Sequence, residues 1–189
     1  MTATSVREVA LVTADDLLAR SVDGQRVERV EGVLTAMTPA GARNGRTAAR
    51  LLLRIGAHAE ATSAGEVLAA ETGFLLAERP DTVRAPDVAF VAAERVAGLD
   101  VAGFSPVVPD LVAEVVSPGD RSSEVTQKAL AWVDAGVRLV WVVDPQARTV
   151  VVHDGAVVRV LRGDDVLDGG EVLPGLSLPL GDVWPVPPP

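Results

Sequence analysis

Cysteine is absent from this chain of 189 residues, which excludes disulfides, thiolate metal sites and cysteine nucleophiles. Long apolar runs are absent too. The sequence has no stretch of about 18 apolar residues that could cross a membrane as a helix, and the apolar run at the start is too short for a signal peptide. The two histidines do not have metal-ligand spacing. We therefore expect a soluble, cytoplasmic protein without a membrane partner.

Positive charge is scarce. Lysine and arginine together number 17 against 26 acidic residues, which gives a net charge of −9. Affinity for phosphates comes from basic side chains, so the chain as a whole should not attract nucleic acid, and only a local basic patch could provide such a partner. Familiar catalytic motifs are missing as well, because the sequence has no phosphate-binding glycine loop, nucleophile elbow or internal repeat.

Apolar residues make up 48% of the sequence, enough for a chain of this length to bury a full core. We expect one domain over residues 1–184 and a disordered proline-rich tail over residues 185–189. Periodicity and turn residues predict helices at 15–20, 42–61 and 122–135, the last with Ser122 or Ser123 as its N-cap. They predict strands at 26–30, 33–37, 88–91, 111–116 and 137–143, and hairpins that join 66–71 to 74–77 and 149–153 to 156–161.

The stretch around Glu114 organises the rest of the chain. Glu114 is the one carboxylate in the short apolar strand predicted at 111–116. Alternate side chains of a strand share a face, so Glu114 lies with Val112 and Val116, and a sheet covered on both faces would remove it from water. An ionised group there is costly unless it finds a cation, a hydrogen-bond donor or a raised pKa. Glu114 is therefore a candidate functional residue.

The helix that follows supplies a candidate partner. Lys128 lies at the edge of the buried stripe of this helix, next to Trp132, and it is the only lysine of the chain. Lysine is a compact charge whose pKa can be shifted by its surroundings, whereas arginine stays protonated. Two alternatives remain open. Lys128 could form a surface pair with Glu124 at i,i+4, or it could contact Glu114.

The first long helix carries arginines along one side. Its apolar face includes Leu51, Ile55 and Ala59. Four arginines occupy another face, within about 80° of one another on an ideal wheel: Arg43, Arg46, Arg50 and Arg54. A solvated face is the usual explanation of such a row. In an acidic chain, this row is nevertheless the place where contacts with phosphates are expected.

Two further carboxylates lie on extended segments. Asp87 stands at the entrance of the strand predicted at 88–91, where a turn or capping role would also explain it, and Glu28 lies on the first strand. Asp87, Glu114 and Lys128 can converge at a sheet edge, where two carboxylates suit Mg²⁺ or Mn²⁺ and leave several ligand positions to water. Such a metal lowers the pKa of a coordinated water, and a nearby ammonium can hold that water or neutralise developing charge.

Five segments of the sequence occur in the order of a known family: RVERVEGVLTAMTP, RAPDVAFV, PDLVAEVVSPGDRSSEVTQK, AGVRLVWVVDP and DDVLDGGEVLPGLSLPL. Together they cover nearly the whole chain and resemble the Uma family of restriction-endonuclease-like proteins, within the PD-(D/E)XK nuclease superfamily. The resemblance implies an α/β, restriction-endonuclease-like fold, a mixed β-sheet flanked by helices. The last predicted hairpin adds a C-terminal β-hairpin to this fold.

By this resemblance, Asp87 is the first metal carboxylate, Glu114 is the second, and Glu28 is an auxiliary acid. The superfamily pattern has a lysine two residues after the glutamate, where this chain has Val116. The resemblance implies that this lysine has moved to the next helix, as Lys128.

These features predict a metal-dependent endonuclease that hydrolyses phosphodiester bonds of nucleic acid, with DNA as the first choice. Asp87 and Glu114 would hold Mg²⁺ or Mn²⁺, Lys128 would assist the attacking water, and the protein would be a homodimer. The alternative is a catalytically inactive nuclease-fold domain that binds nucleic acid or a protein partner, which the negative charge and Val116 favour. A purely structural ion pair between Glu114 and Lys128 also remains open.

Overall fold

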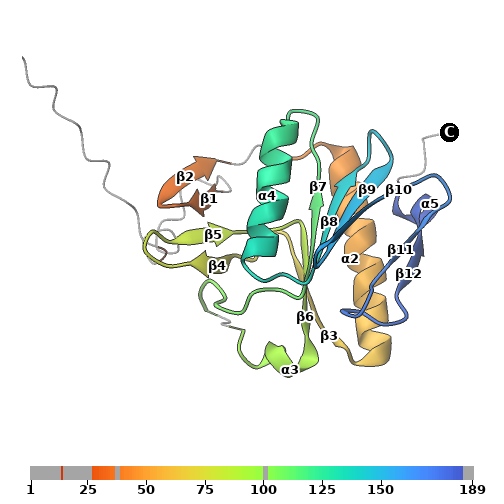
Figure 1. Ribbon diagram of the computed structural model, residues 1–189. Coiled ribbons are helices and arrows are strands. Elements are labelled where there is room, and N and C mark those ends of the chain that lie inside the picture. The colour runs from red at the N-terminus through yellow and green to blue at the C-terminus, as the bar shows by residue number, and fades with distance from the viewer. Residues whose placement is uncertain (1–13, 15–26, 37–38, 100–101, 185–189) are drawn as a thin grey trace, which may run out of the picture.

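The computed structural model describes residues 14, 27–36, 39–99 and 102–184 (Figure 1). Its centre is a six-stranded sheet with the order β10-β9-β8-β7-β6-β3. The strands are β3 (Gly65–Ala69), β6 (Val88–Ala92), β7 (Leu111–Val115), β8 (Leu139–Asp144), β9 (Thr149–Asp154) and β10 (Val157–Arg162). β7 and β8 run parallel, and the other neighbouring pairs are antiparallel. The sheet is therefore mixed, as predicted.

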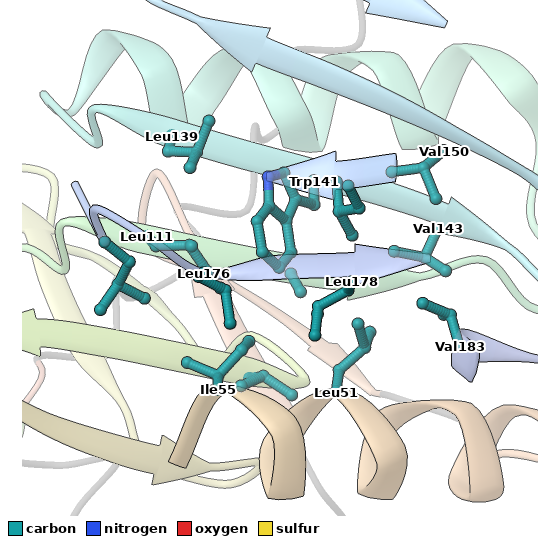
Figure 2. Packing of buried hydrophobic residues seen from close by; sticks show 14 of the residues in the cluster. Leu51, Ile55, Leu111, Leu139, Trp141, Val143, Val150, Leu176, Leu178 and Val183 are labelled. Carbon is teal, nitrogen blue, oxygen red and sulfur yellow. The ribbon is translucent and has the colours of Figure 1, made fainter. Parts of the chain in front are cut away.

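Helices cover both faces of this sheet. α2 (Ala42–Thr62) packs on one face and α4 (Ser122–Asp134) on the other (Figure 1). Figure 2 shows Leu51 and Ile55 of α2 directed toward Trp141 of β8, with which they form one buried cluster. On the α4 side, Trp132 belongs to a second cluster that includes Val140 of β8. Because β8 alternates between the two clusters, nearly all of its side chains are apolar and buried.

The unit β7-α4-β8 carries the site. β7 is buried at every position except Glu114, which is half-buried, and α4 connects it to the parallel strand β8. α4 ends as predicted, because Gly136 adopts a φ of +95°, a left-handed conformation that suits glycine. The predicted serine N-cap is wrong. The N-cap residue is Arg121, without a side-chain hydrogen bond, because the helix already includes Ser122 in its first turn.

A second, smaller sheet has the order β2-β1-β5-β4 and lies beside α4 (Figure 1). Its strands are β1 (Val27–Val30), β2 (Val33–Ala36), β4 (Phe74–Ala77) and β5 (Thr82–Arg84). The predicted connection between the first two strands is a tight turn in which Glu31 and Gly32 have φ values of 49° and 80°. This sheet brings β1, and with it Glu28, to the α4 side of the molecule.

The predicted hairpin between residues 66–71 and 74–77 is wrong. β3 pairs with β6 at the edge of the six-stranded sheet, whereas β4 pairs with β5 in the smaller sheet. The turn between them contains Glu71 at a φ of 83° and directs the chain from one sheet into the other. The turn residues therefore predicted the position of the turn between β3 and β4 correctly, but the strand partners inferred from them were wrong.

The C-terminal part covers the α2 side of the six-stranded sheet. The predicted hairpin at Asp154 and Gly155 joins β9 to β10. It is followed by β11 (Val166–Asp168), β12 (Ser177–Pro179) and α5 (Leu180–Val183), while the short α3 (Ala93–Val96) follows β6. The predicted helix at 15–20 and the tail at 185–189 lie outside the described residues. Among the helices that the structure describes, none is both long and apolar enough to cross a membrane.

Candidate functional site

Glu114 points from β7 toward α4, and two side chains of that helix meet its carboxylate. Trp132 Nε1–H donates a hydrogen bond to Oε1 at 2.7 Å, and Lys128 Nζ lies 2.9 Å from Oε2. Lys128 and Trp132 are four residues apart, so they project from the same side of α4. Each oxygen of Glu114 therefore has its own donor from the helix.

Lys128 also contacts a second carboxylate, which comes from the smaller sheet. Its Nζ lies 3.0 Å from Oε1 of Glu28 on β1. Glu28 is in turn held by Arg84, whose guanidinium lies 3.0 Å from Oε2, and by the N–H of Ala85, which donates to Oε1 at 3.3 Å. Arg84, Glu28, Lys128 and Glu114 thus form a chain of alternating charges that links β5, β1, α4 and β7.

Burial shapes the electrostatics of this chain. The side chains of Glu28, Glu114 and Lys128 are only 6%, 12% and 20% exposed. Burial raises the pKa of Glu114 to about 7; the nearby charges of Asp87 and Glu28 add to this rise, and Lys128 opposes it. Burial alone would lower the pKa of the Lys128 ammonium, but the charges of Glu114 and Glu28 raise it above its usual value. Lys128 is therefore a fixed cation at neutral pH.

Asp87 lies against the same part of β7. Val88 of β6 pairs with Ala113 of β7, so the next position of this antiparallel register sets Asp87 opposite Glu114. Oδ2 of Asp87 accepts a hydrogen bond from the N–H of Val115 at 2.7 Å. This contact with the main chain agrees with the turn or capping role that would also explain Asp87. Its charge, however, also acts on Glu114.

The two carboxylates suit a divalent ion with few protein ligands. A carboxylate oxygen has two lone pairs, so the hydrogen bonds to Glu114 and Asp87 leave further acceptor sites on both groups. Over the ranges that the structure describes, no group of three or more acidic or histidine side chains could hold a metal ion. Mg²⁺ commonly uses one or two carboxylates and completes its octahedron with water and substrate oxygens. Asp87 and Glu114 are therefore the two carboxylates through which this part of the fold would hold such an ion.

The structure brings together the four side chains that the sequence singled out: Asp87, Glu114, Lys128 and Glu28. The alternative pair between Glu124 and Lys128 is absent, since Glu124 contacts Arg121, at 3.9 Å. Lysine at a half-buried position of an arginine-rich chain was thus a useful signal for the contact with Glu114.

The row of four arginines begins near the carboxyl end of β7 and runs along α2, away from the α4 side on which Lys128 and Trp132 meet Glu114. α2 packs on the face of the sheet opposite to α4 (Figure 1). Arg50 donates a hydrogen bond to the main-chain oxygen of Asp182 at 3.0 Å, and Arg54 lies 3.3 Å from the carboxylate of the same residue. The expectation that the four side chains contact phosphates stays a prediction. Half of the row binds the C-terminal segment.

Two site residues were missed by the sequence reasoning. Trp132 was assigned to the buried stripe of its helix, where it does pack, but its N–H also reaches Glu114. Its position four residues after Lys128 was the available signal. Arg84 was part of a segment read only as an extended approach to β6, and nothing in that segment pointed to Glu28, which lies 56 residues earlier in the chain.

Asn44 connects α2 to the end of β7. Its Nδ2 donates hydrogen bonds to the main-chain oxygen of Val116 at 2.7 Å and to Oγ of Ser117 at 2.9 Å. Asn44 is buried, so these contacts satisfy its amide and fix the turn that leads from β7 into α4. The N-terminus of α2, with the exposed Arg43, therefore lies next to the carboxyl end of β7.

A mixed sheet with helices on both faces is the architecture of a restriction-endonuclease-like α/β fold. A crystal structure described as "a putative nuclease belonging to DUF820 from Anabaena variabilis ATCC 29413" is similar, with a TM-score of 0.78 and 18% sequence identity. The similarity covers 91% of this chain and 97% of that chain. No curated protein matches the sequence.

The family model of Uma2, described as "Putative restriction endonuclease", matches residues 14–181. This match spans most of the chain, so the protein belongs to the Uma2 family. The fold class and the family predicted from the sequence are both confirmed.

Proposed function

We propose that this protein is a metal-dependent nuclease that hydrolyses phosphodiester bonds of nucleic acid, with DNA as its substrate. One observation carries the proposal. The ammonium of the only lysine lies within 3.0 Å of two largely buried carboxylates, Glu114 and Glu28, and Asp87, directly before the neighbouring strand β6, stands beside Glu114. The description of the family as restriction endonucleases supports a nucleic acid as the substrate.

Asp87 and Glu114 are the residues that would hold Mg²⁺ or Mn²⁺. A divalent ion bound there lowers the pKa of a coordinated water and offsets negative charge on the phosphoryl group. Asp87 is fixed by its hydrogen bond from Val115, and Glu114 by its two donors from α4. Both carboxylates are therefore oriented by the fold before any ligand arrives.

Lys128 acts as a cation and hydrogen-bond donor. Because the charges of Glu114 and Glu28 raise the pKa of its ammonium, it cannot serve as the base that deprotonates water at neutral pH. It can instead donate to the attacking water or to a phosphoryl oxygen as negative charge develops there. The reason for lysine at this position is then its compact shape, which fits between two carboxylates, rather than a lowered pKa.

Glu28 holds Lys128 in place. It is anchored by Arg84 and by the N–H of Ala85, and it contacts Nζ of Lys128 from the side of the smaller sheet. An ammonium held only by Glu114 would move when that carboxylate binds a metal. With Glu28 as a second partner, Lys128 keeps its position beside the metal carboxylates, which agrees with an auxiliary rather than a metal-binding role for Glu28.

The alternative function is a domain that keeps the fold and binds nucleic acid or a protein without cleavage. One structural observation favours it: both oxygens of Glu114 already have donors, so the buried charges are satisfied without a metal. The net charge of −9 also disfavours strong binding to a polyanion. The position of Asp87 favours the enzyme, because a purely structural ion pair between Glu114 and Lys128 does not need a further carboxylate beside it.

Metal binding and cleavage together test the proposal. Isothermal titration with Mn²⁺ should show binding to the wild type and to Lys128→Ala, and loss of binding in Asp87→Asn and Glu114→Gln. Supercoiled plasmid should be cut by the wild type with Mn²⁺ and by none of these variants. Glu124→Gln, a change on the exposed side of α4, is the matched control and should behave like the wild type.

A wild type that binds Mn²⁺ through Asp87 but cuts neither DNA nor RNA would support the non-catalytic alternative. Cleavage that persists in EDTA, or that survives Asp87→Asn, would contradict the metal mechanism. The same preparations test two finer parts of the proposal. Competition between DNA and RNA gives the preferred nucleic acid, and light scattering gives the mass that a homodimer requires.

A further inference from the structure

Trp132 is the one tryptophan in the described residues whose N–H meets a site carboxylate. Its side chain is fully buried, and its ring packs edge-on against Phe74, with centroids 6.4 Å apart and planes at 79°. This packing fixes the direction of the indole N–H, which donates to Oε1 of Glu114 at 2.7 Å. The distance is at the short end of the range for an N–H donor.

We propose that Trp132 is a positioning residue for Glu114, which it holds in the orientation that binds the metal. The inference rests on the proposed metal site and adds a residue that acts through Glu114. A carboxylate on a flexible glutamate side chain can rotate about its last torsion. The hydrogen bond at Oε1 fixes that torsion, so Oε2 faces Lys128 and the free lone pairs of Glu114 keep one direction relative to Asp87.

Packing alone does not explain this hydrogen bond. Trp141 lies on the opposite face of the same sheet, in the cluster of Figure 2. It is as fully buried as Trp132, yet its Nε1 has no hydrogen-bond partner among the described residues. The fold therefore tolerates a buried indole without an acceptor. Trp132, by contrast, donates to Glu114, which is one of the two carboxylates of the proposed metal site.

Phenylalanine variants at the two positions separate positioning from packing. Trp132→Phe keeps an aromatic ring against Phe74 and removes the donor to Glu114, whereas Trp141→Phe removes an indole that has no described partner. Loss of a group that orients a metal ligand typically weakens metal affinity by about 10–100-fold. We expect Trp132→Phe to weaken Mn²⁺ binding by about that factor in isothermal titration. Trp141→Phe should stay within about twofold of the wild type.

A second measurement does not depend on the Trp132 variant folding. In ¹⁵N-labelled wild type, the indole N–H signals are assigned from the variants Trp141→Phe and Trp184→Phe. On titration with Mg²⁺, the signal of Trp132 should shift in step with the occupancy of the site, because its acceptor becomes a metal ligand. The signals of Trp141 and Trp184 should shift much less.

The outcomes separate this inference from the proposed function. A wild type that binds neither Mn²⁺ nor Mg²⁺ would overturn both. A wild type that binds the metal, together with a folded Trp132→Phe of unchanged affinity, would overturn the positioning role alone. An indole signal of Trp132 that stays in place while the metal saturates the wild type would do the same.

Discussion

Removal of the Lys128 ammonium should destabilise the protein, and the structure gives the size of the effect. In Lys128→Met the apolar stem is kept and the charge is lost. Oxygens of Glu28 and Glu114 both lie within 3.0 Å of Nζ, so they are no more than about 6 Å apart. Two unscreened carboxylates at that separation repel by about 3 kcal/mol at an effective dielectric constant of about 20. Breaking a buried ion pair costs about 3–5 kcal/mol in general. Loss of the ammonium also raises the pKa of Glu114 further, and protonation then relieves part of the repulsion. We therefore expect a loss of at most about 3 kcal/mol at pH 8.

The loss should depend on pH and on metal. Near pH 6 Glu114 is largely protonated even in the wild type, because its pKa is about 7. The repulsion with Glu28 is then reduced, and Lys128→Met should cost less than at pH 8. Mn²⁺ should restore part of the stability at pH 8, since a divalent ion at Glu114 supplies the missing positive charge.

Urea unfolding followed by circular dichroism measures these differences. Arg121→Met is the matched control, because this exposed cation adjoins the same helix and its only described acidic contact, with Glu124, is 3.9 Å long; it should change the free energy of unfolding by less than about 0.5 kcal/mol. The double variant Glu28→Gln/Lys128→Met should lose less than the sum of the single variants. A loss below about 1 kcal/mol for Lys128→Met at pH 8 would refute the charge chain as a stabilising unit.

Three further predictions concern cleavage, nucleic-acid binding and pH. Lys128→Arg should fold and bind Mn²⁺ but cut plasmid at least about 100-fold more slowly, because a forked guanidinium does not fit between two carboxylates. Cleavage at the wild-type rate would contradict the proposed role of the ammonium. Arg43→Ala should reduce the slope of log affinity for DNA against log salt by about one unit, whereas Arg50→Ala/Arg54→Ala should leave the slope unchanged. The reverse result would show that the phosphates contact the middle of α2 and not its N-terminus. Without metal, the difference in free energy of unfolding between the wild type and Glu114→Gln should fall by at most about 3 kcal/mol from pH 5 to pH 8. The raised pKa of Glu114 gives a stabilising contribution that is complete below about pH 4.5 and is lost as the pH rises through about 7. A difference that rises with pH would contradict the raised pKa.

The central part of the fold could be predicted from local sequence. β7, α4 and β8 follow one another with clear turn residues, and the single carboxylate of β7 stands out against apolar neighbours. The edges could not be predicted in the same way. β3 and β4 adjoin a strong turn signal, but β3 pairs with β6 and β4 pairs with the next strand, β5, instead of with each other. Strand pairing depends on the three-dimensional packing of the sheets, which a turn signal does not encode.

The site was predictable to the extent that unusual residues mark it. Lys128 and Glu114 each break a local pattern, one as the single lysine and the other as a charge in an apolar strand. Trp132 and Arg84 break no pattern. A tryptophan in a buried stripe and an arginine at the end of a short strand are common, and their roles arise only from contacts with Glu114 and Glu28. Sequence reasoning therefore found the charged centre and missed the groups that orient it.

The location of the lysine on α4 has a structural consequence for the site. Position 116, where the resemblance to the PD-(D/E)XK pattern would predict a lysine, is a valine that packs against the α4-side core. A lysine at that position would extend from the residue directly after β7 and would depend on the six-stranded sheet alone. Lys128 instead extends from α4 and contacts Glu114 of the six-stranded sheet and Glu28 of the smaller sheet. The same ammonium therefore serves the proposed reaction and joins β1 to β7. A shift of the smaller sheet would move the ammonium relative to Asp87 and Glu114, so the chemistry of the site is coupled to the packing of β1 against α4.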